Sequence, residues 1–285
     1  MGVKGVILAA GYGTRFLPVT RVVPKELLPL VDRPAIDFLL EEFESAGIRE
    51  VLVITSRRKK ALEDWFDRDP ELEGALEKSG KVSALARIRP RNLAVQFVRQ
   101  KEMKGTGDAL LLARSFAGSD PVVVAYPDDL FGEPNCTASL IDAWRTTQKS
   151  VLSVVDMSGK DVSRYGVVDG DANGDLVTVR QVVEKPAPGE EPSHWVSMGR
   201  YLYTSEFWDA LAALKSGHKE GEYYPMPAMN QLAAQGKMVA KLISAPLTDT
   251  GEPLGYVKAV VEEGLGRMDI GPSLRAWLIE KLAMK

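Results

Sequence analysis

The sequence predicts an α/β fold whose central sheet is mixed and mostly parallel, is flanked by helices and carries an added antiparallel hairpin. Short apolar runs, each long enough for one buried strand, alternate with stretches in which apolar residues recur at helical spacing. A strand, a helix and another strand in this order imply a right-handed crossover and hence parallel strands. Two strand-like runs at 165–169 and 176–184, joined by the turn-rich stretch 170–174, predict the hairpin.

The first predicted elements lie on either side of residue 30. A strand covers 6–10, Pro34 opens a helix that Gly47 closes, and a second buried strand covers 51–55. The next predicted elements are a helix over 57–66, a peripheral helix and loop over 67–92, and a strand over 93–99. They are followed by a helix with Ala109, Leu112, Ala113 and Phe116 on one face, a strand over 122–126, a helix over 136–149, and strands over 151–156 and 196–203. The last predicted elements are a helix capped by Ser205, a strand over 238–244, and a helical remainder to residue 285 with Leu274, Leu278 and Leu282 on one face.

Composition narrows the class of protein. The 285 residues are 45% hydrophobic and 26% charged, which is typical of a soluble globular protein. With a net charge of −3, the protein has no overall positive potential that would attract nucleic acid. The sequence contains no run of eighteen apolar residues, so no membrane span is predicted. The chain enters a strand at once without a signal peptide, and its one cysteine, Cys136, excludes an internal disulfide framework. We therefore expect a cytoplasmic protein whose partners include neither nucleic acid nor a membrane.

A glycine-rich turn follows the first predicted strand. Gly11 and Gly13 allow the backbone to approach a ligand closely, and their N–H groups can cradle an anion. Two cations, Arg15 and Lys25, come next, which favours a polyphosphate over the alternative of a plain strand-to-helix turn. Phe16 occupies the position of the third glycine of a dinucleotide fingerprint, and no Walker motif is present. This excludes the two commonest phosphate motifs but not phosphate binding.

Two further stretches carry candidate ligand-binding groups. The turn at 100–107, QKEMKGTG, runs directly into a helix, and this arrangement points backbone amides toward a ligand. The alternative is a flexible loop, which the same residues would also form. Asp128 and Asp129 follow a buried strand, where ligands of open α/β sheets bind, and two carboxylates suit Mg²⁺. A surface turn is the alternative for this pair. His194 and His218 lie in no motif, so a histidine-based site is not expected.

The segment 8–29, LAAGYGTRFLPVTRVVPKELLP, resembles the motifs G-x-G-T-R-x-x-P and P-K-E-x-x-P of the sugar-1-phosphate nucleotidylyltransferases. The resemblance spans roughly residues 3–263 and includes the Tyr165-Gly166-Val167, Glu184-Lys185-Pro186 and Gly199-Arg200-Tyr201 segments. It implies a Rossmann-like fold of the nucleotide-diphospho-sugar transferase type. It also implies one domain over 1–285, with a nucleotide-binding part at 1–130, a sugar-binding part at 131–263 and a C-terminal helix at 264–285.

The resemblance further implies the reaction and its residues. The branch that this chain resembles most transfers UMP reversibly from UTP to glucose 1-phosphate, yielding UDP-glucose and pyrophosphate. Arg15 and Lys25 would be catalytic, and Asp128 and Asp249 would hold Mg²⁺, although an aspartate before Thr-Gly is by itself more often a helix N-cap. The resemblance implies a homo-oligomer, a dimer or a tetramer. Its implied substrate-binding residues are Ala9, Ala10, Gly11, Gly13, Thr14, Glu26, Gln100, Gly105, Asp129, Gly166, Glu184, Lys185 and Gly199.

The chain departs from the family's motifs in two places. Asp108 stands where the family often has histidine, and 223–227 replaces its Leu-Thr-Asp-Ala. These changes leave open which sugar 1-phosphate is the substrate and which oligomer the protein forms. Transfer from dTTP, or to another hexose 1-phosphate, is the nearest alternative, because uracil and thymine differ by one methyl group. A catalytically silent paralogue that binds nucleotide sugars is a distant one, since such a protein would be expected to lose a cation or a metal ligand.

Overall fold

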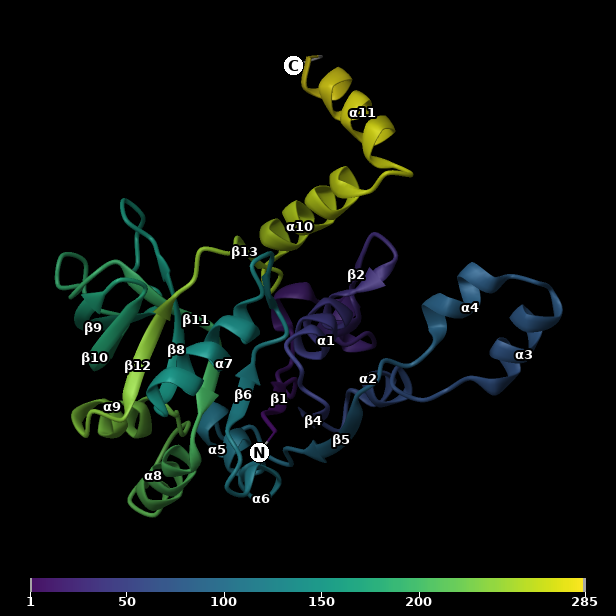
Figure 1. The fold of residues 1–285 in the computed structure, drawn as a ribbon. Helices are drawn as coiled ribbons and strands as arrows, with labels where there is room; N and C mark the ends of the chain where they lie inside the picture. Colours follow the sequence, from purple (N-terminus) through teal and green to yellow (C-terminus); the bar gives the residue numbers. More distant parts are fainter. Residues whose placement is uncertain (1, 284–285) are drawn as a thin grey trace.

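The first strand, β1 (Lys4–Leu8), lies inside the parallel half of a nine-stranded sheet (Figure 1). The computed structural model describes residues 2–283. β1 pairs in parallel with β4 (Glu50–Thr55) on one side and with β6 (Val122–Ala125) on the other, and β5 (Ala94–Arg99) continues the parallel set beyond β4. The parallel arrangement predicted from the order of strands and helices is therefore confirmed.

The other half of the sheet is mixed. β11 (Trp195–Tyr203) lies between β6 and β8 (Ser150–Asp156) and runs antiparallel to both. β12 (Met238–Leu242) is parallel to β8, and the full strand order is β5-β4-β1-β6-β11-β8-β12-β10-β9. Two short ladders complete the strands, β2 (Pro29–Leu30) with β3 (Arg33–Pro34) and β7 (Asp129–Phe131) with β13 (Leu247–Asp249).

The predicted hairpin forms, and its second strand has the predicted bounds, but its first strand is longer than predicted. β9 (Gly166–Asn173) pairs antiparallel with β10 (Leu176–Glu184), so the stretch 170–173 belongs to a strand rather than to the turn. Gly170 explains the error, since a side chain there would come within 2.7 Å of Val177 Cγ1. Glycine therefore serves close approach of two strands at this position. A register shift between Val179 and Gln181 bends β10 at the same place.

Helices cover both faces of the sheet. Successive residues of β1 point to opposite faces, so Val6 joins one buried cluster and Ile7 the other. The first cluster is closed by α5 (Thr106–Leu111), α6 (Arg114–Ala117), α8 (Ser205–Lys215) and α9 (Met226–Ala234). The second is closed by α1 (Ala35–Ser45), α2 (Lys60–Asp64) and α7 (Cys136–Thr147).

Several predicted helices have different bounds. The helix expected over 57–66 is the short α2, and the peripheral segment holds two helices, α3 (Pro70–Lys78) and α4 (Val82–Ile88), that project from the sheet (Figure 1). The helix after the second glycine-rich turn breaks into α5 and α6, so Leu112 is 36% exposed instead of facing the core. Ser205 is the first residue of α8, and Thr204 is its cap. Local periodicity does not register these breaks, because packing decides them.

The C-terminal segment forms an arm that stands away from the sheet (Figure 1). α10 (Pro253–Gly266) is followed by α11 (Gly271–Ala283), so the predicted helical remainder is two helices with a bend between them. Leu274 packs against Gly264 of α10, whereas Leu282, expected on the same face, is 71% exposed. Within the described part of the chain, no helix has the length and apolar character that crossing a membrane requires.

A buried ion pair links the two halves of the sheet. Arg200 of β11 is fully buried and donates to both carboxylate oxygens of Glu42 on α1, at 3.1 and 2.7 Å. Its remaining N–H groups reach the carbonyl oxygens of Tyr126 and Gly199, at 3.2 and 3.0 Å. A buried guanidinium needs such acceptors, because an unpaired charge in the core is costly. Arg200 thereby fixes α1, β11 and the end of β6 relative to one another.

Replacing Glu42 with glutamine tests this pair. The Glu42→Gln substitution keeps the volume but removes the charge opposite Arg200, so we expect the free energy of unfolding to fall by about 3–5 kcal/mol. Urea unfolding measures it. Asp142→Asn, which breaks the exposed pair between Arg145 and Asp142, is the control and should cost less than about 1 kcal/mol. Equal losses in the two variants would contradict a structural role for the Arg200 pair.

Candidate active site

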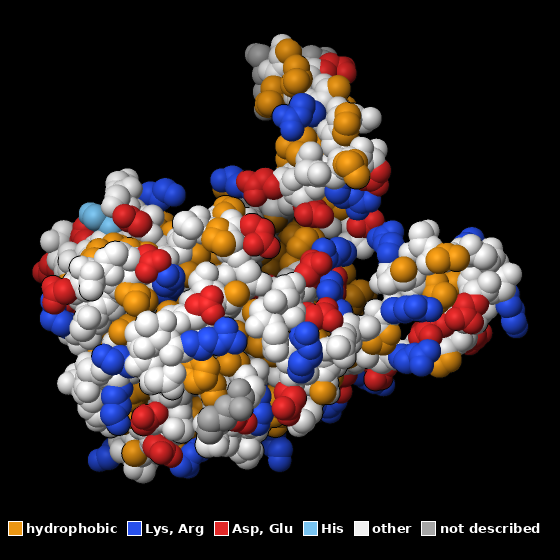
Figure 2. All heavy atoms as spheres, in the orientation of Figure 1, with side chains coloured by type: hydrophobic (Ala, Val, Ile, Leu, Met, Phe, Trp, Pro, Cys, Tyr) orange, Lys and Arg blue, Asp and Glu red, His pale blue; other side chains and the backbone are white. Residues whose placement is uncertain are grey.

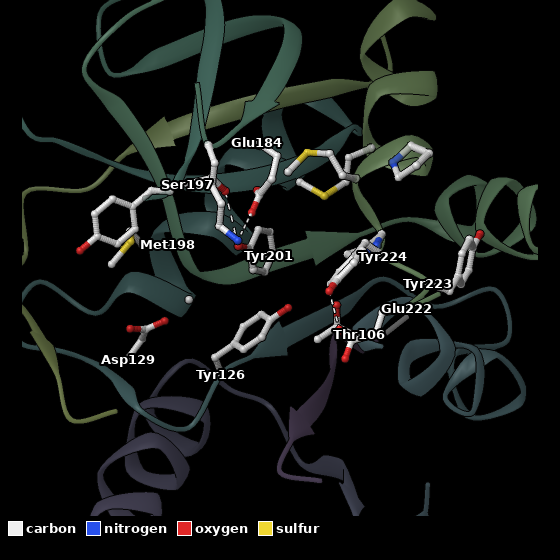
Figure 3. Close-up of a pocket in the computed structure, with 18 of the residues that line it drawn as sticks. Thr106, Tyr126, Asp129, Glu184, Ser197, Met198, Tyr201, Glu222, Tyr223 and Tyr224 are labelled. Atoms are coloured by element: carbon white, nitrogen blue, oxygen red, sulfur yellow. Dashed lines mark hydrogen bonds and ion pairs between the residues drawn. The ribbon is translucent and has the colours of Figure 1, made fainter. Parts of the chain in front are cut away.

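A cavity of about 1080 Å³ opens along the edge where the parallel strands end (Figure 3). Its lining residues come from both halves of the sheet and from the segment before α9. The cavity is therefore built between the parallel strands and the antiparallel addition, as expected for open α/β sheets. The predicted site residues that line it are Arg15, Asp128, Asp129, Gly166, Glu184, Lys185, Gly199 and Asp249.

The first glycine-rich turn leaves β1 at its carboxyl end. Ala9 and Ala10 are buried, and Gly11 is exposed with open space where a side chain would be. Gly13 has a φ of 65° and precedes the short 3-10 helix η1 (Thr14–Phe16). That left-handed conformation favours glycine, and the turn leads to Arg15, which lines the cavity.

Lys25 begins the 3-10 helix η3 (Lys25–Leu27) and forms an ion pair with Asp128. Burial alone would lower the pKa of the Lys25 ammonium, but the Asp128 carboxylate more than offsets this, so the pKa is raised above its ordinary value. Lys25 is consequently a fixed cation at neutral pH. The sequence predicted both residues as functional, and folding brings them together across 103 positions of the chain.

The carboxylates of Asp128 and Asp249 both lie close to Gly251. β7 and β13 pair so that Asp249 stands opposite Asp129, and Thr250 donates through its N–H and its hydroxyl to the carbonyl of Asp128, at 2.8 and 2.9 Å. A side chain on Gly251 would come within 2.6 Å of Asp128 Oδ2 and 2.9 Å of Asp249 Oδ1. The missing side chain of Gly251 thus lets the two carboxylates converge.

This pair of carboxylates fits Mg²⁺. Two hard oxygen donors converge, and among residues 2–283 no group of three His, Cys, Asp or Glu is arranged to hold a metal ion. Mg²⁺ in enzymes of phosphate esters commonly takes one or two protein carboxylates and fills its other positions with substrate phosphates and water. The donor set therefore suits an ion that binds together with substrate rather than a closed protein cage.

Asp129 lies beside these two carboxylates and also lines the cavity. Burial, reinforced by the charges of Asp128 and Asp249, raises the pKa of its carboxyl group to about 7. Gly199 has a φ of 50°, and a side chain there would come within 2.6 Å of Asp129 Oδ2. Figure 3 shows the Asp129 carboxylate pointing into the cavity beside Tyr126. Glycine at position 199 therefore makes room for Asp129.

Glu184 and Lys185 lie at the far end of the cavity, where β10 ends. Lys185 Nζ is 3.5 Å from Glu184 Oε1, and Gly166 stands opposite Glu184 in the hairpin register. A side chain on Gly166 would lie 3.3 Å from Glu184 Oε2 and 3.4 Å from Met226 Cε. These contacts form a mixed wall of one carboxylate, one ammonium and one thioether, suited to a hydroxylated ligand with an anionic group.

The second glycine-rich turn is held by Gln100. The Gln100 amide is buried and donates to the carbonyl of Gly105 at 3.1 Å, while its backbone N–H donates to Thr55 at the end of β4. Gly105 has a φ of 96°, which again favours glycine. The turn is therefore attached to the end of β4, at the same edge of the sheet as the first glycine-rich turn.

Sequence reasoning missed several cavity-lining residues, among them Tyr126, Arg164 and Asn230, and it also missed Lys59. Its ammonium is buried and lies 2.6 and 2.8 Å from the two carboxylate oxygens of Glu26, which is also buried. Burial lowers the pKa of Lys59, and Glu26 only partly opposes this. The signal was a run of four cations, 57–60, directly after a buried strand. Glu26, predicted to bind substrate, has its carboxylate held by Lys59 in this structure.

The family follows from comparison with known proteins. A family model described as nucleotidyl transferase matches residues 4–263. The chain belongs to the nucleotidyl transferase family. A curated member, a UTP–glucose-1-phosphate uridylyltransferase of Staphylococcus epidermidis, is 38% identical over 279 residues, which is 96% of each chain.

Solved structures of this nucleotidyl transferase family share the fold. The UTP-bound UGPase from Acinetobacter baumannii superposes with a TM-score of 0.89 at 31% identity and covers 98% of this chain and 99% of its own. A UDP-glucose pyrophosphorylase complexed with UDP-glucose gives a TM-score of 0.81 at 31% identity, covering 94% of this chain and all of its own. The predicted mixed sheet of a nucleotidyltransferase is therefore confirmed.

Proposed function

We propose that this chain transfers UMP from UTP to glucose 1-phosphate, releasing pyrophosphate and forming UDP-glucose. The observation that carries the proposal is the cavity, which is lined by Asp128 and Asp249 at one end and by Glu184 and Lys185 at the other, with Lys25 paired to Asp128. Relatives that are 38% identical are named UTP–glucose-1-phosphate uridylyltransferase, and solved structures at 31% identity hold UTP or UDP-glucose. Both lines of support favour the same reaction.

The reaction brings two anions together. The phosphate of the sugar is already ionised near neutral pH, so its oxygen attacks the α-phosphorus without a general base, and pyrophosphate leaves. The protein aligns the two phosphates and reduces their repulsion. Lys25 is the cation assigned to the α-phosphate, because it is fixed and half-buried. Arg15 is assigned to the β- and γ-phosphates, because its side chain is 61% exposed and lies 3.8 Å from Glu252, which leaves it free to turn toward a phosphate.

Asp128 and Asp249 are the residues that would hold Mg²⁺. When bound, Mg²⁺ neutralises charge on the phosphates that meet at the reaction centre. Asp128 also pairs with Lys25, so the proposed metal ligand and the proposed catalytic cation are adjacent. The carboxylates and the ammonium form one charged cluster at the end of the cavity, opposite the sugar.

The remaining predicted residues are assigned from the resemblance to the family, and only those assigned to the sugar line the cavity. The backbone of Ala9, Ala10, Gly11, Gly13 and Thr14 is assigned to the phosphates. Gln100 and Gly105 are assigned to the uracil base, and so is Glu26, whose carboxylate is held by Lys59. The residues assigned to the sugar are Asp129, Gly166, Glu184, Lys185 and Gly199.

The proposed domain organisation is a single domain with two parts. We infer one nucleotidyltransferase domain, with the nucleotide-binding part at 1–130 and the sugar-binding part at 131–263. The pairing of β6 with β11 supports this, because it joins the two parts within a single sheet. The C-terminal segment, 264–285, lies beyond the region that the family model matches.

The substrate pair is tested by pyrophosphate release with Mg²⁺, crossing UTP and dTTP with glucose 1-phosphate, galactose 1-phosphate and N-acetylglucosamine 1-phosphate. We expect the fastest release with UTP and glucose 1-phosphate, and its loss when a chelator removes the metal. A faster rate with dTTP or another sugar would keep the chemistry and change the substrate. No release from folded protein that binds UTP would favour a silent paralogue.

The Lys25→Ala substitution tests the catalytic assignment. We expect kcat to fall by about 10²–10³, because the variant loses a cation that stabilises charge at the transferred phosphate. Steady-state kinetics with a circular dichroism spectrum measure activity and folding together. Lys258→Ala, an exposed lysine on α10, is the matched control with unchanged kcat. A folded Lys25→Ala enzyme with the parent's kcat would refute the role of Lys25.

The homo-oligomer implied by the family is proposed to form through the C-terminal arm. Trp277, Ile279 and Leu282 of α11 are 52%, 63% and 71% exposed, and Figure 2 shows hydrophobic side chains along the arm. We expect the parent to sediment as a dimer or tetramer and Ile279→Glu to shift it toward monomer. Arg275→Glu, an exposed charge change on the same helix, is the control. A monomeric parent at micromolar concentration would contradict the proposal.

A further inference from the structure

The second glycine-rich turn is bound to the segment before α9 by two backbone hydrogen bonds. Tyr223 N–H donates to the carbonyl of Lys104 at 2.7 Å, and Gly107 N–H donates to the carbonyl of Tyr223 at 2.8 Å. Gly105 and Gly107 permit this approach, since a side chain on Gly105 would come within 2.7 Å of Tyr223 N and one on Gly107 within 2.9 Å of Tyr223 O. The glycines thus serve contact with Tyr223 as well as the shape of the turn.

The side chain of Tyr223 is anchored on α8. It is only 3% exposed, and its hydroxyl donates to the carbonyl of Leu211 at 2.5 Å. The ammonium of Lys215 lies 4.8 Å from the centroid of its ring and 3.0 Å from Asp108 Oδ1. Asp108 belongs to α5, directly after the turn. The contacts therefore form a continuous network that links the turn to Tyr223, Tyr223 to α8, and α8 to α5.

This network of contacts includes both places at which the sequence departs from the family's motifs. Asp108 replaces the frequent histidine, and Tyr223 begins the segment that replaces Leu-Thr-Asp-Ala. The two positions are distant in sequence, yet Lys215 contacts both of them. The departures are consequently one structural feature, in which a tyrosine, a lysine and an aspartate together hold the turn.

We propose that Tyr223 is a positioning residue for the nucleotide. It acts by fixing residues 104–107 of the second glycine-rich turn, and the Asp108–Lys215 pair supports Tyr223 in this role. The inference rests on the proposed function, because it takes this turn to bind the base of UTP. The same segment carries Glu222, Tyr224 and Met226 along the cavity (Figure 3), so Tyr223 also joins the base-binding turn to the sugar end. Loosening Tyr223 weakens nucleotide binding without removing a group from the reacting phosphates.

The test compares Tyr223→Phe, Lys215→Met, Asp108→Asn and the double variant Asp108→Asn/Lys215→Met. Isothermal titration calorimetry gives the Kd for UTP, and pyrophosphate release gives KM and kcat. We expect Tyr223→Phe to raise the Kd and KM for UTP about tenfold with kcat within about threefold of the parent. Each single ion-pair variant should raise the Kd about threefold, and the double variant should raise it no further, because the two groups act as one pair.

Arg114→Met is the matched control. The Arg114–Asp209 pair also joins the helices after the turn to α8, at 2.7 Å, but lies away from the turn. We expect its Kd for UTP to equal the parent's. Variants with a lowered melting temperature but an unchanged Kd would overturn the positioning role in favour of a merely structural one. Should Tyr223→Phe fail to fold, the ion-pair variants decide by the same criterion.

Failure of the inference and failure of the proposed function give different results. A parent that binds UTP but releases no pyrophosphate refutes the proposed reaction, while the Kd values of the variants still test the role of Tyr223. A parent with full turnover whose variants keep its Kd and KM for UTP refutes the role of Tyr223 alone. A parent that does not bind UTP overturns both.

Discussion

The buried pair of Arg200 with Glu42 is the interaction on which the site depends. It connects residues 158 positions apart, one on the strand that joins the two halves of the sheet and one on the first helix. Because the guanidinium is fully buried, each of its donors must find an acceptor, and two of these acceptors are the carbonyl oxygens of Tyr126 and Gly199. Gly199 is thereby fixed against the side chain of Asp129, where its missing side chain makes room for the carboxylate.

Charges at the end of the site proposed for the phosphates are paired within the protein. Lys25 meets Asp128, Lys59 meets Glu26, and Arg15 and Arg164 both approach Glu252, at 3.8 and 3.6 Å. The buried pair Lys59–Glu26 is a fixed part of the structure, since separating it would leave a charge in the core. The exposed arginines are held only loosely, because solvent screens exposed ion pairs. The site therefore combines rigidly held cations, which pair with Asp128 and Glu26, with loosely held arginines that line the cavity.

Much of the architecture was predictable because its signals are local. Apolar runs predicted the strands of the parallel half, and the turns after them marked the edge where Arg15 and Asp128 line the cavity and Lys25 pairs with Asp128. The errors are local as well. The hairpin turn was placed too early because Gly170 serves strand contact rather than a turn, and the helix after the second glycine-rich turn was drawn through a break that packing imposes. Lys59 was overlooked because a lysine in a basic run gives no sign of burial.

The sequence by itself determined the α/β class, the succession of strands and helices along the chain, the glycine-rich turns and the residue types at the strand ends, because each depends on neighbours within a few positions. Only the tertiary structure decided which charges pair. Lys25 meets Asp128 across 103 positions, Lys59 meets Glu26 across 33, and Lys215 joins Asp108 to Tyr223. The physical reason is that the cost of a buried charge is offset by whichever opposite charge the packed sheet brings near, and no local pattern encodes that choice.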